Sequence, residues 1–187
     1  MFCPCEVIKN YGKDIITAMM HASNVMAQPR TEIFMRWEPP LENWIKLNVD
    51  GASKGNPGLA GGGGALRTHK GDWIKGFAAN FGICSSVKAE MLAVLQGLWL
   101  AWNLGILRLE LHMDSKVMVD TLTGATKNYF IVKNCKELLH DLRWSIKLSH
   151  CYRKSNRVAN RLANLGIGQS TPIVIFETPS HSWLYLT

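Results

Sequence analysis

Acidic side chains are scarce in this sequence of 187 residues. The chain has 14 Asp and Glu against 21 Lys and Arg, which gives a net charge of +7 at pH 7. Residues 43–170 carry 17 of the basic side chains and only 8 of the acidic ones. A basic domain of this kind favours a polyanionic partner, most often nucleic acid. On charge alone, a basic domain without such a partner is the alternative.

Long apolar runs and targeting signals are also lacking. No apolar run approaches the ~20 residues that a membrane helix needs, so no membrane partner is expected. The first residues, MFCPCEVIKNYGKD, show no basic region followed by a long apolar stretch, which disfavours a secretory signal. Glu6 and Asp14 disfavour a transit peptide. The compartment stays open, with an intracellular location in the nucleus or cytoplasm favoured.

Cysteines are few and unpaired in pattern. The five lie at positions 3, 5, 84, 135 and 151, an odd and scattered set that predicts free thiols in a reducing compartment. A Tyr/Phe-x-Asp-Asp run, typical of reverse-transcriptase catalytic centres, is missing, so polymerase activity is not expected.

Composition divides the chain into three segments. Residues 1–43 are expected to form an N-terminal helical segment and linker, because apolar residues recur at helical steps over 10–28 and Pro39–Pro40 interrupts the chain. Residues 44–168 are expected to form the domain. Residues 169–187 are a tail without a usable motif, which is expected either to pack on a sheet edge or to mediate association. The hydrophobic content of 47% suffices for a core.

The domain segment alternates between strand and helix patterns, which predicts an α/β fold with a mixed sheet. The glycine-dense residues 51–64 are expected to supply turn chemistry after a first strand that ends at Asp50. The first three strands are expected to be antiparallel and the later two parallel. The pattern predicts strands at 44–50, at two runs within 64–82, at 106–114 and at 145–152, and helices at 85–105, 114–124, 130–143 and 155–166.

Three acids of the basic domain stand at informative positions. Asp50 follows the first predicted strand, Glu90 lies early in the long helix, and Asp114 lies where a strand gives way to a helix. Each has an ordinary structural explanation: an Asp-Gly turn, a favourable charge in the first turn of a helix, and a helix cap. Two of them would nevertheless meet if their strands are neighbours, with the third facing them from the helix.

Four segments resemble the ribonuclease H family in the right order. DGASKGNPGLAGGGGALR (50–67) resembles the first hairpin, SSVKAEMLAVLQGL (85–98) the helix with the catalytic glutamate, and HMDSKVMVDTLTG (112–124) the third motif. SHCYRKSNRVANRLANLG (149–166) resembles the last helix of plant ribonuclease H-like domains related to non-LTR retroelement reverse transcriptases. The resemblance covers about 44–168. It implies a five-stranded mixed sheet flanked by helices.

The resemblance also implies a reaction, the hydrolysis of the RNA strand of an RNA–DNA hybrid with two Mg²⁺ ions or, alternatively, Mn²⁺. Asp50, Glu90 and Asp114 match the family's metal ligands and catalytic acids. Carboxylate oxygens suit such hard cations. Asn160 matches the family's fourth acid, an aspartate, and carries no charge. Impaired activity is therefore expected.

The same resemblance assigns substrate contacts. Ser53, Gly55 and Asn56 match hairpin positions that approach the RNA strand, and the alternative is a glycine-rich turn alone. Arg153 and Arg157, at the basic start of the last helix, are expected to contact phosphates. A catalytically inactive nucleic-acid-binding module of the same fold is the alternative function. Another nuclease of the same broad fold is disfavoured by the DG-x-x-x-GNPG hairpin.

Overall fold

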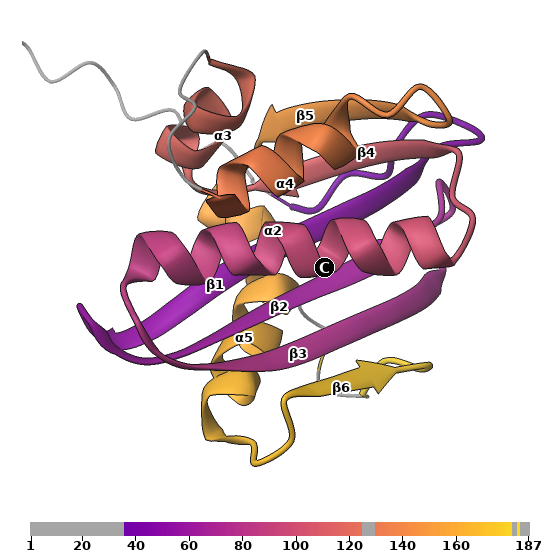
Figure 1. The fold of residues 1–187 in the computed structure, drawn as a ribbon. Coiled ribbons are helices and arrows are strands. Elements are labelled where there is room, and N and C mark those ends of the chain that lie inside the picture. Colours follow the sequence, from indigo (N-terminus) through magenta and orange to yellow (C-terminus); the bar gives the residue numbers. More distant parts are fainter. Residues whose placement is uncertain (1–35, 125–129, 181–182, 184–187) are drawn as a thin grey trace, which may run out of the picture. The chain divides into compact units, whose positions relative to one another are not determined.

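Six strands form one mixed sheet in the order β5-β4-β1-β2-β3-β6 (Figure 1). The computed structural model describes residues 36–124, 130–180 and 183. The helix predicted over 10–28 lies outside the described residues. The strands are β1 (Ile45–Gly55), β2 (Gly58–Arg67), β3 (Trp73–Cys84), β4 (Arg108–Met113), β5 (Ser145–His150) and β6 (Ile173–Phe176).

The strand directions agree with the predicted mixed sheet. β1, β2 and β3 pair antiparallel in sequence order, whereas β4 pairs parallel with β1 and β5 parallel with β4. The predicted count of five strands is one short, because β6 adds antiparallel to β3 at the edge of the sheet. β6 belongs to the segment expected to be a tail, whose run IVIF is apolar enough to pair at an edge.

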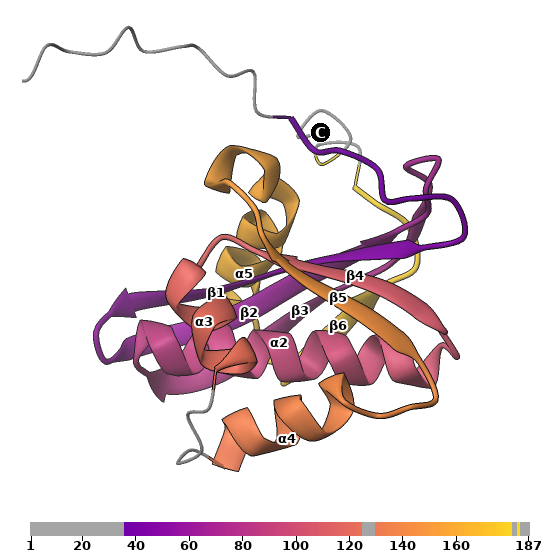
Figure 2. The same ribbon diagram turned by 90° about the horizontal axis from the view of Figure 1, so that it is seen from above.

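Helices cover both faces of the sheet. α2, α3 and α4 lie on one face and α5 lies on the other (Figures 1 and 2). No helix of the described segments is long and apolar enough to cross a membrane. The helices are α2 (Ser86–Asn103), α3 (Lys116–Thr123), α4 (Phe130–Leu139) and α5 (Arg157–Gly168), and a short 3-10 turn, η1 (Arg153–Ser155), precedes α5.

The main hydrophobic core lies between the sheet and α2. Leu47 and Val49 of β1, Phe77 of β3 and Leu98 of α2 are all nearly inaccessible to solvent there. A second, smaller cluster lies on the α5 face, and it includes Trp183 from beyond β6. The segment expected to be a tail therefore completes both the sheet and the packing of α5. The second cluster consists of Ala65, Ala78, Val158, Leu162 and Trp183.

The glycine-dense segment lies mostly within strands rather than in a turn. The prediction that the first strand ends at Asp50 is wrong, because β1 continues to Gly55. A Cβ atom on Gly61 would lie 2.6 Å from the carbonyl oxygen of Ala163, and one on Gly63 would lie 2.3 Å from the backbone nitrogen of Ala163. Glycine is required at these positions because the α5 backbone packs directly on β2.

Candidate active site

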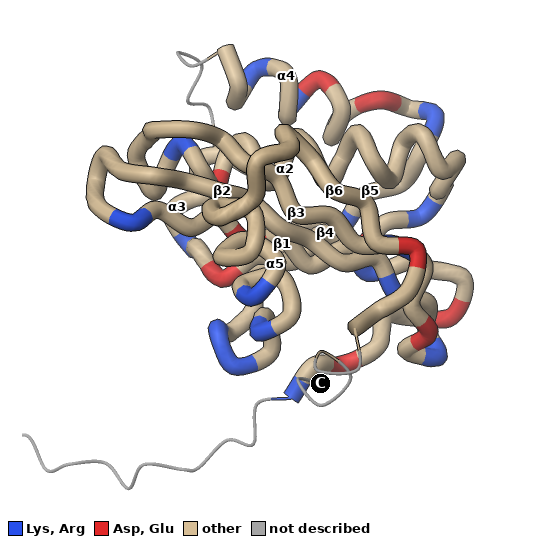
Figure 3. The backbone as a smooth tube through the Cα atoms, turned by 90° about the horizontal axis from the view of Figure 1, so that it is seen from below, with Lys and Arg blue, Asp and Glu red and all other residues tan. Residues whose placement is uncertain are grey.

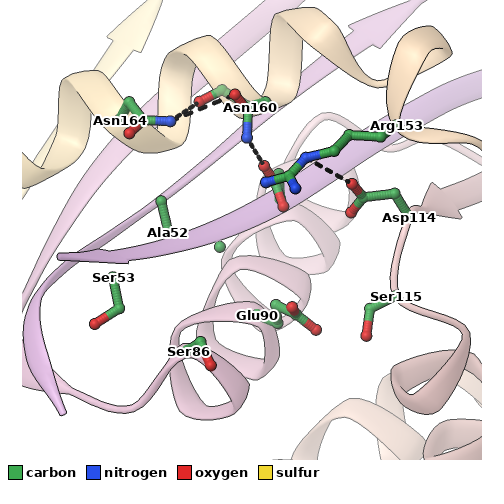
Figure 4. A pocket seen from close by; sticks show the side chains of 11 residues that line it. Ala52, Ser53, Ser86, Glu90, Asp114, Ser115, Arg153, Asn160 and Asn164 are labelled. Carbon is green, nitrogen blue, oxygen red and sulfur yellow. Dashed lines mark hydrogen bonds and ion pairs between the residues drawn. The ribbon is translucent and has the colours of Figure 1, made fainter. Parts of the chain in front are cut away.

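The three predicted acids line one pocket of about 460 Å³ (Figure 4). Asp50 comes from β1, Glu90 from α2, and Asp114 from the residue directly after β4. β1 and β4 pair in parallel up to Asn48 opposite His112, so Asp50 and Asp114 lie two steps further along adjacent chains. The fold thus brings the three acids together although 64 positions separate Asp50 from Asp114.

The ordinary structural explanations for these acids do not apply. Asp50 lies inside a strand, so it is not part of an Asp-Gly turn. Glu90 lies beyond the first turn of α2, where no acidic residue is found. The cap of α3 is Ser115, whose side chain accepts a hydrogen bond from the backbone N–H of Met118 at 3.4 Å. The three carboxylates are therefore not explained by local backbone needs.

A single glycine sets the distance between α2 and β1. A Cβ atom on Gly51 would lie 2.2 Å from the backbone nitrogen of Glu90. The helix therefore approaches the strand more closely than any other residue would allow. This contact places Glu90 against Gly51 of β1, the residue that follows Asp50.

Burial and mutual repulsion raise the pKa of two of the carboxyl groups. Burial, followed by the charge of Asp114, raises the pKa of Asp50 to about 7, while the hydrogen bond from Asn160 opposes this rise. Burial also raises the pKa of Glu90, against a hydrogen bond with Ser115. Clustered acids with raised pKa values form a site where a bound cation would relieve the repulsion.

Asn160 directs a donor, not an acceptor, at the acids. Its Nδ2 donates a hydrogen bond to Oδ2 of Asp50 at 2.6 Å. Its Oδ1 faces Asn164, whose Nδ2 lies 3.4 Å away and also donates to the backbone carbonyl of Asn160 at 2.9 Å. In this orientation the amide stabilises the charged form of Asp50 and contributes no ligand oxygen to the pocket.

Arg153 is the one predicted cationic residue that lines the pocket. Its Nε lies 3.8 Å from Oδ2 of Asp114, and its charge lowers the pKa of Asp50 and of Glu90. Arg157 is exposed on α5 and does not line this pocket. Nε2 of His150 lies 3.2 Å from the backbone carbonyl oxygen of Asp114. The two side chains that contact Asp114 thus come from two separate elements, η1 and β5.

The hairpin residues predicted to approach RNA lie beside the pocket. Ser53 lines it, and its hydroxyl donates to the backbone oxygens of Gly55 at 2.6 Å and Cys84 at 3.0 Å. Oδ1 of Asn56 accepts a hydrogen bond from the backbone N–H of Ser86 at 3.1 Å. Gly55 has φ +102°, which requires glycine. These bonds hold the hairpin tip against the start of α2.

Sequence reasoning missed several residues of the pocket. Ser86 and Ser115 line it at the starts of α2 and α3, and Asn164 lines it one helical turn after Asn160. The spacing of Asn160 and Asn164, four residues apart on one helix face, was a signal that could have found the last of these. The two serines gave no signal beyond their capping potential.

The chemistry of the donor set fits a hard divalent cation. The pocket offers carboxylate oxygens from three elements, in a setting that penalises their unpaired charge. Among the described residues, however, no group of three His, Cys, Asp or Glu side chains is already arranged to hold a metal. The three acids therefore have the ligand chemistry that such a cation prefers, although their present arrangement is not that of a formed metal site.

The fold and the acidic pocket define a ribonuclease H-like domain. Residues 48–166 match the family described as reverse transcriptase-like. A ribonuclease H-like protein of Arabidopsis thaliana is 40% identical over 179 residues, which cover 92% of this chain and 28% of that protein. Ribonuclease HI of Halobacterium salinarum is 30% identical over 155 residues, covering 79% of this chain and 77% of that protein. The chain belongs to the reverse transcriptase-like family with the ribonuclease H fold.

Solved structures give the same fold. Ribonuclease H1 of Halobacterium salinarum superposes with a TM-score of 0.61 at 28% identity, covering 66% of this chain and 97% of that one. The N-terminal ribonuclease H domain of a Mycobacterium tuberculosis protein gives the same TM-score and identity, covering 66% and 93%. A ribonuclease H1 solved in complex with an RNA/DNA hybrid has a TM-score of 0.59 at 24% identity, covering 66% and 96%, and shows the fold alone.

Proposed function

We propose that this chain binds RNA–DNA hybrids and hydrolyses their RNA strand, at a rate that Asn160 limits. The observation that carries the proposal is the convergence of Asp50, Glu90 and Asp114 in one pocket, with Asn160 completing its wall. Names of relatives support the substrate class, because two relatives covered over most of their length are ribonucleases H. The activity is assigned to residues 44–168.

Asp50, Glu90 and Asp114 would hold the divalent ions, two Mg²⁺ or alternatively Mn²⁺. When bound, such ions activate the attacking water and stabilise the leaving 3′ oxygen of the RNA. The chain's own contribution is to hold three carboxylates in one pocket, with Asp50 buried, where their repulsion favours cation binding. The charge of Asp50 is central, because this side chain faces both Asp114 and Asn160.

Substrate binding is assigned to the two elements that flank the pocket. Hydrogen bonds of Ser53 and Asn56 hold the hairpin tip against the start of α2, and the backbone groups of Ser53, Gly55 and Asn56 would approach the RNA strand. Arg153 and Arg157 would contact phosphates from the opposite side, since both are exposed, Arg153 in η1 and Arg157 at the start of α5. The hybrid would thus lie across the pocket, between the hairpin and α5.

Asn160 weakens this site in two ways. It removes one negative charge from the set of four, and it directs an N–H at Asp50, where a metal ligand would present oxygen. To act as a ligand, its amide must turn and lose the hydrogen bonds with Asp50 and Asn164. Slow hydrolysis follows from weaker metal binding.

A catalytically inactive nucleic-acid-binding module is the second candidate. The observation that favours it is that Asn160 and Arg153 already satisfy Asp50 and Asp114 from within the chain. These internal partners lower the need for an external cation. The basic surface of α5 would still bind phosphates.

Cleavage of a labelled RNA–DNA hybrid separates the two candidates. We expect weak cleavage by the native chain in Mg²⁺ or Mn²⁺, a clear gain in Asn160→Asp, and none in Asp50→Asn, which keeps the size of the side chain and removes its charge. Equal, robust cleavage by the native chain and Asn160→Asp would contradict the limiting role of position 160. If Asn160→Asp stays inactive while it still binds the hybrid, the binding module is the function.

A further inference from the structure

A tryptophan outside the family match is connected to the active site by buried side chains. Trp37 precedes the matched region, which begins at residue 48, in a segment expected to be a linker. Its indole Nε1 donates a hydrogen bond to Oδ1 of Asn48 at 2.9 Å. Asn48 is a strand residue of β1, two positions before Asp50. The contact therefore reaches the strand that carries the central acid.

The connection continues from β1 to α5. Nδ2 of Asn48 donates to Oδ1 of Asn156 at 3.1 Å, and Nδ2 of Asn156 donates to the backbone oxygen of Val49 at 2.9 Å. Asn156 is only 1% exposed and Asn48 only 5%. Because an unpaired polar group at such depth is costly, each bond depends on the next one being formed.

The hydrogen bond between Asn48 and Asn156 lies next to the one between Asp50 and Asn160, and both join β1 to α5. On the strand, Asn48 and Asp50 are two residues apart, about 6.7 Å at the usual rise of a strand. On the helix, Asn156 and Asn160 are four residues apart, about 6 Å along the axis and on the same face. The two spacings match, so the pairs Asn48–Asn156 and Asp50–Asn160 join β1 and α5 at consecutive levels.

Asn156 also sets the position of the backbone around the site. It lies between η1 and α5 and makes no side-chain cap bond, because its side chain is used by Asn48 and Val49. Its backbone N–H donates to the carbonyl of Arg153 at 3.1 Å, and its carbonyl accepts from the N–H of Asn160 at 3.0 Å. The backbone of Asn156 is therefore hydrogen-bonded to both pocket residues of this region, Arg153 and Asn160.

The segment of Trp37 is itself held firmly on the domain. The indole ring lies 4.9 Å from the guanidinium of Arg67, which is 6% exposed. Nζ of Lys46 donates to the carbonyl of Glu38 at 2.8 Å and pairs with Glu110 at 3.5 Å. A ring stacked on a cation in a buried setting is a stable anchor. Because Trp37 is held in place, its hydrogen bond can fix the position of the Asn48 side chain.

We propose that Trp37 is a positioning residue for the acidic pocket, acting through Asn48 and Asn156 on the contact between Asp50 and Asn160. The segment around Trp37 is then a working part of the domain and not a linker. The inference deepens the proposed function, on which its importance for catalysis rests, but its structural content concerns the metal-free chain.

The test is the rate at which the Nδ2 hydrogens of Asn160 exchange with solvent, measured by NMR on the full chain without metal or hybrid. Trp37→Phe keeps an aromatic ring and removes only the N–H donor. We expect exchange at Asn160 about tenfold faster, equivalent to losing one net hydrogen bond of about 1.4 kcal/mol. Trp99→Phe is the matched control, since Trp99 is about half exposed on α2 and remote from this chain of contacts.

A merely structural role predicts a different result. Asn160 would then exchange at the native rate in Trp37→Phe even if the thermal midpoint falls, and that outcome would overturn the proposal. Asn156→Ala gives an independent check, because it removes the helix side of the connection and should accelerate exchange at least as much. Native exchange in a folded Asn156→Ala would likewise overturn it. Since no hybrid is used, failure of hybrid cleavage would count against the proposed function alone.

Discussion

At the scale of single residues, the hydrogen bond from Asn160 to Asp50 lowers the cost of holding a charge on Asp50 in the pocket. A buried carboxylate next to Asp114 and Glu90 is costly in its charged form, and the amide N–H offsets part of that cost. Under the proposed function, an amide in place of an acid at position 160 would therefore stabilise the metal-free pocket and would remove a ligand. We therefore expect the same substitution to have opposite effects on stability and on cation binding.

The raised pKa of Asp50 predicts how stability depends on pH when metal is removed by EDTA. The pKa of Asp50 rises from 3.8 to about 7 on folding, so between these values the folded chain holds a proton that the unfolded chain has lost. Its contribution to stability is complete below pH 3.8 and is lost as pH rises through about 7. We expect the free energy of unfolding, measured in urea, to fall from pH 5 to pH 8.

Asp50→Asn is the control for this pH dependence, because the amide does not titrate. In Asp50→Asn the free energy of unfolding should fall less steeply with pH than in the native chain. The difference should be on the order of 1.4 kcal/mol for each unit by which folding raises the pKa of Asp50. An identical decline in the native chain and in Asp50→Asn would show that Asp50 is not the titrating group.

The sequence allowed the acids of the pocket to be predicted, but not their hydrogen bonds. Asp50, Glu90 and Asp114 stand in segments that resemble ribonuclease H motifs in the same order along the chain. The parallel pairing of β1 and β4 brings Asp50 and Asp114 together. The orientation of Asn160 depends on Asn164 and on the burial of Asp50, which are tertiary facts. For the same reason the partners of Trp37 and Asn156 could not be derived from spacing.

At the scale of elements, the close packing of α5 on β2 positions the α5 residues that line the pocket, Asn160 and Asn164. Gly61 and Gly63 remove the side chains that would otherwise separate the strand from the helix. Local sequence favoured a turn in this glycine-dense segment, because glycine is rare inside strands. The close approach of a helix, which only tertiary structure reveals, is the reason for glycine here.

Gly63→Ala is predicted to unfold the chain more easily and to displace α5. Its Cβ would lie 2.3 Å from the backbone nitrogen of Ala163, an atom that cannot move without the helix. We expect a loss of about 3 kcal/mol in the free energy of unfolding, measured by urea denaturation. Gly168→Ala is the matched control on α5, since nothing lies within 4 Å of its Cβ, and a change within about 0.5 kcal/mol is expected. Equal effects of the two would contradict this packing argument.

β6 shows why the end of the fold was harder to predict than its centre. Its four residues are too few to show a clear alternation, and only pairing with β3 at an exposed edge makes them a strand. Trp183 adds a side chain to the cluster on the α5 face, far along the sequence from its partners Ala65 and Ala78. Contacts of this length follow from topology, which local patterns do not contain.

At the scale of the whole molecule, charge separates the pocket from its surroundings. Figure 3 shows Lys and Arg along α5 and the turn before it, on the side of the sheet opposite α4. The acidic pocket lies beside this basic stretch. Under the proposed function, the basic side chains would hold the polyanion while its scissile bond meets the carboxylates.

The basic side of α5 predicts a salt-dependent affinity for hybrids. Arg157→Gln and Arg161→Gln, both at exposed positions, should each reduce the slope of log K against log[salt] by about 1. Fluorescence anisotropy with a labelled hybrid at several salt concentrations measures that slope. Lys133→Gln on α4 is the control, since this lysine is exposed on the other face, and it should leave the slope unchanged. A reduction of the same size in Lys133→Gln would mean that binding is not localised to α5.

Direct binding of Mn²⁺, followed by electron paramagnetic resonance at pH 8, tests whether the pocket is a metal site with one ligand lacking. At that pH most Asp50 side chains are charged, because the pKa is about 7. We predict that Asn160→Asp binds Mn²⁺ at least about tenfold more tightly than the native chain, and that Asp50→Asn loses binding. Equal affinity in the native chain and Asn160→Asp, or native affinity in Asp50→Asn, would contradict the account.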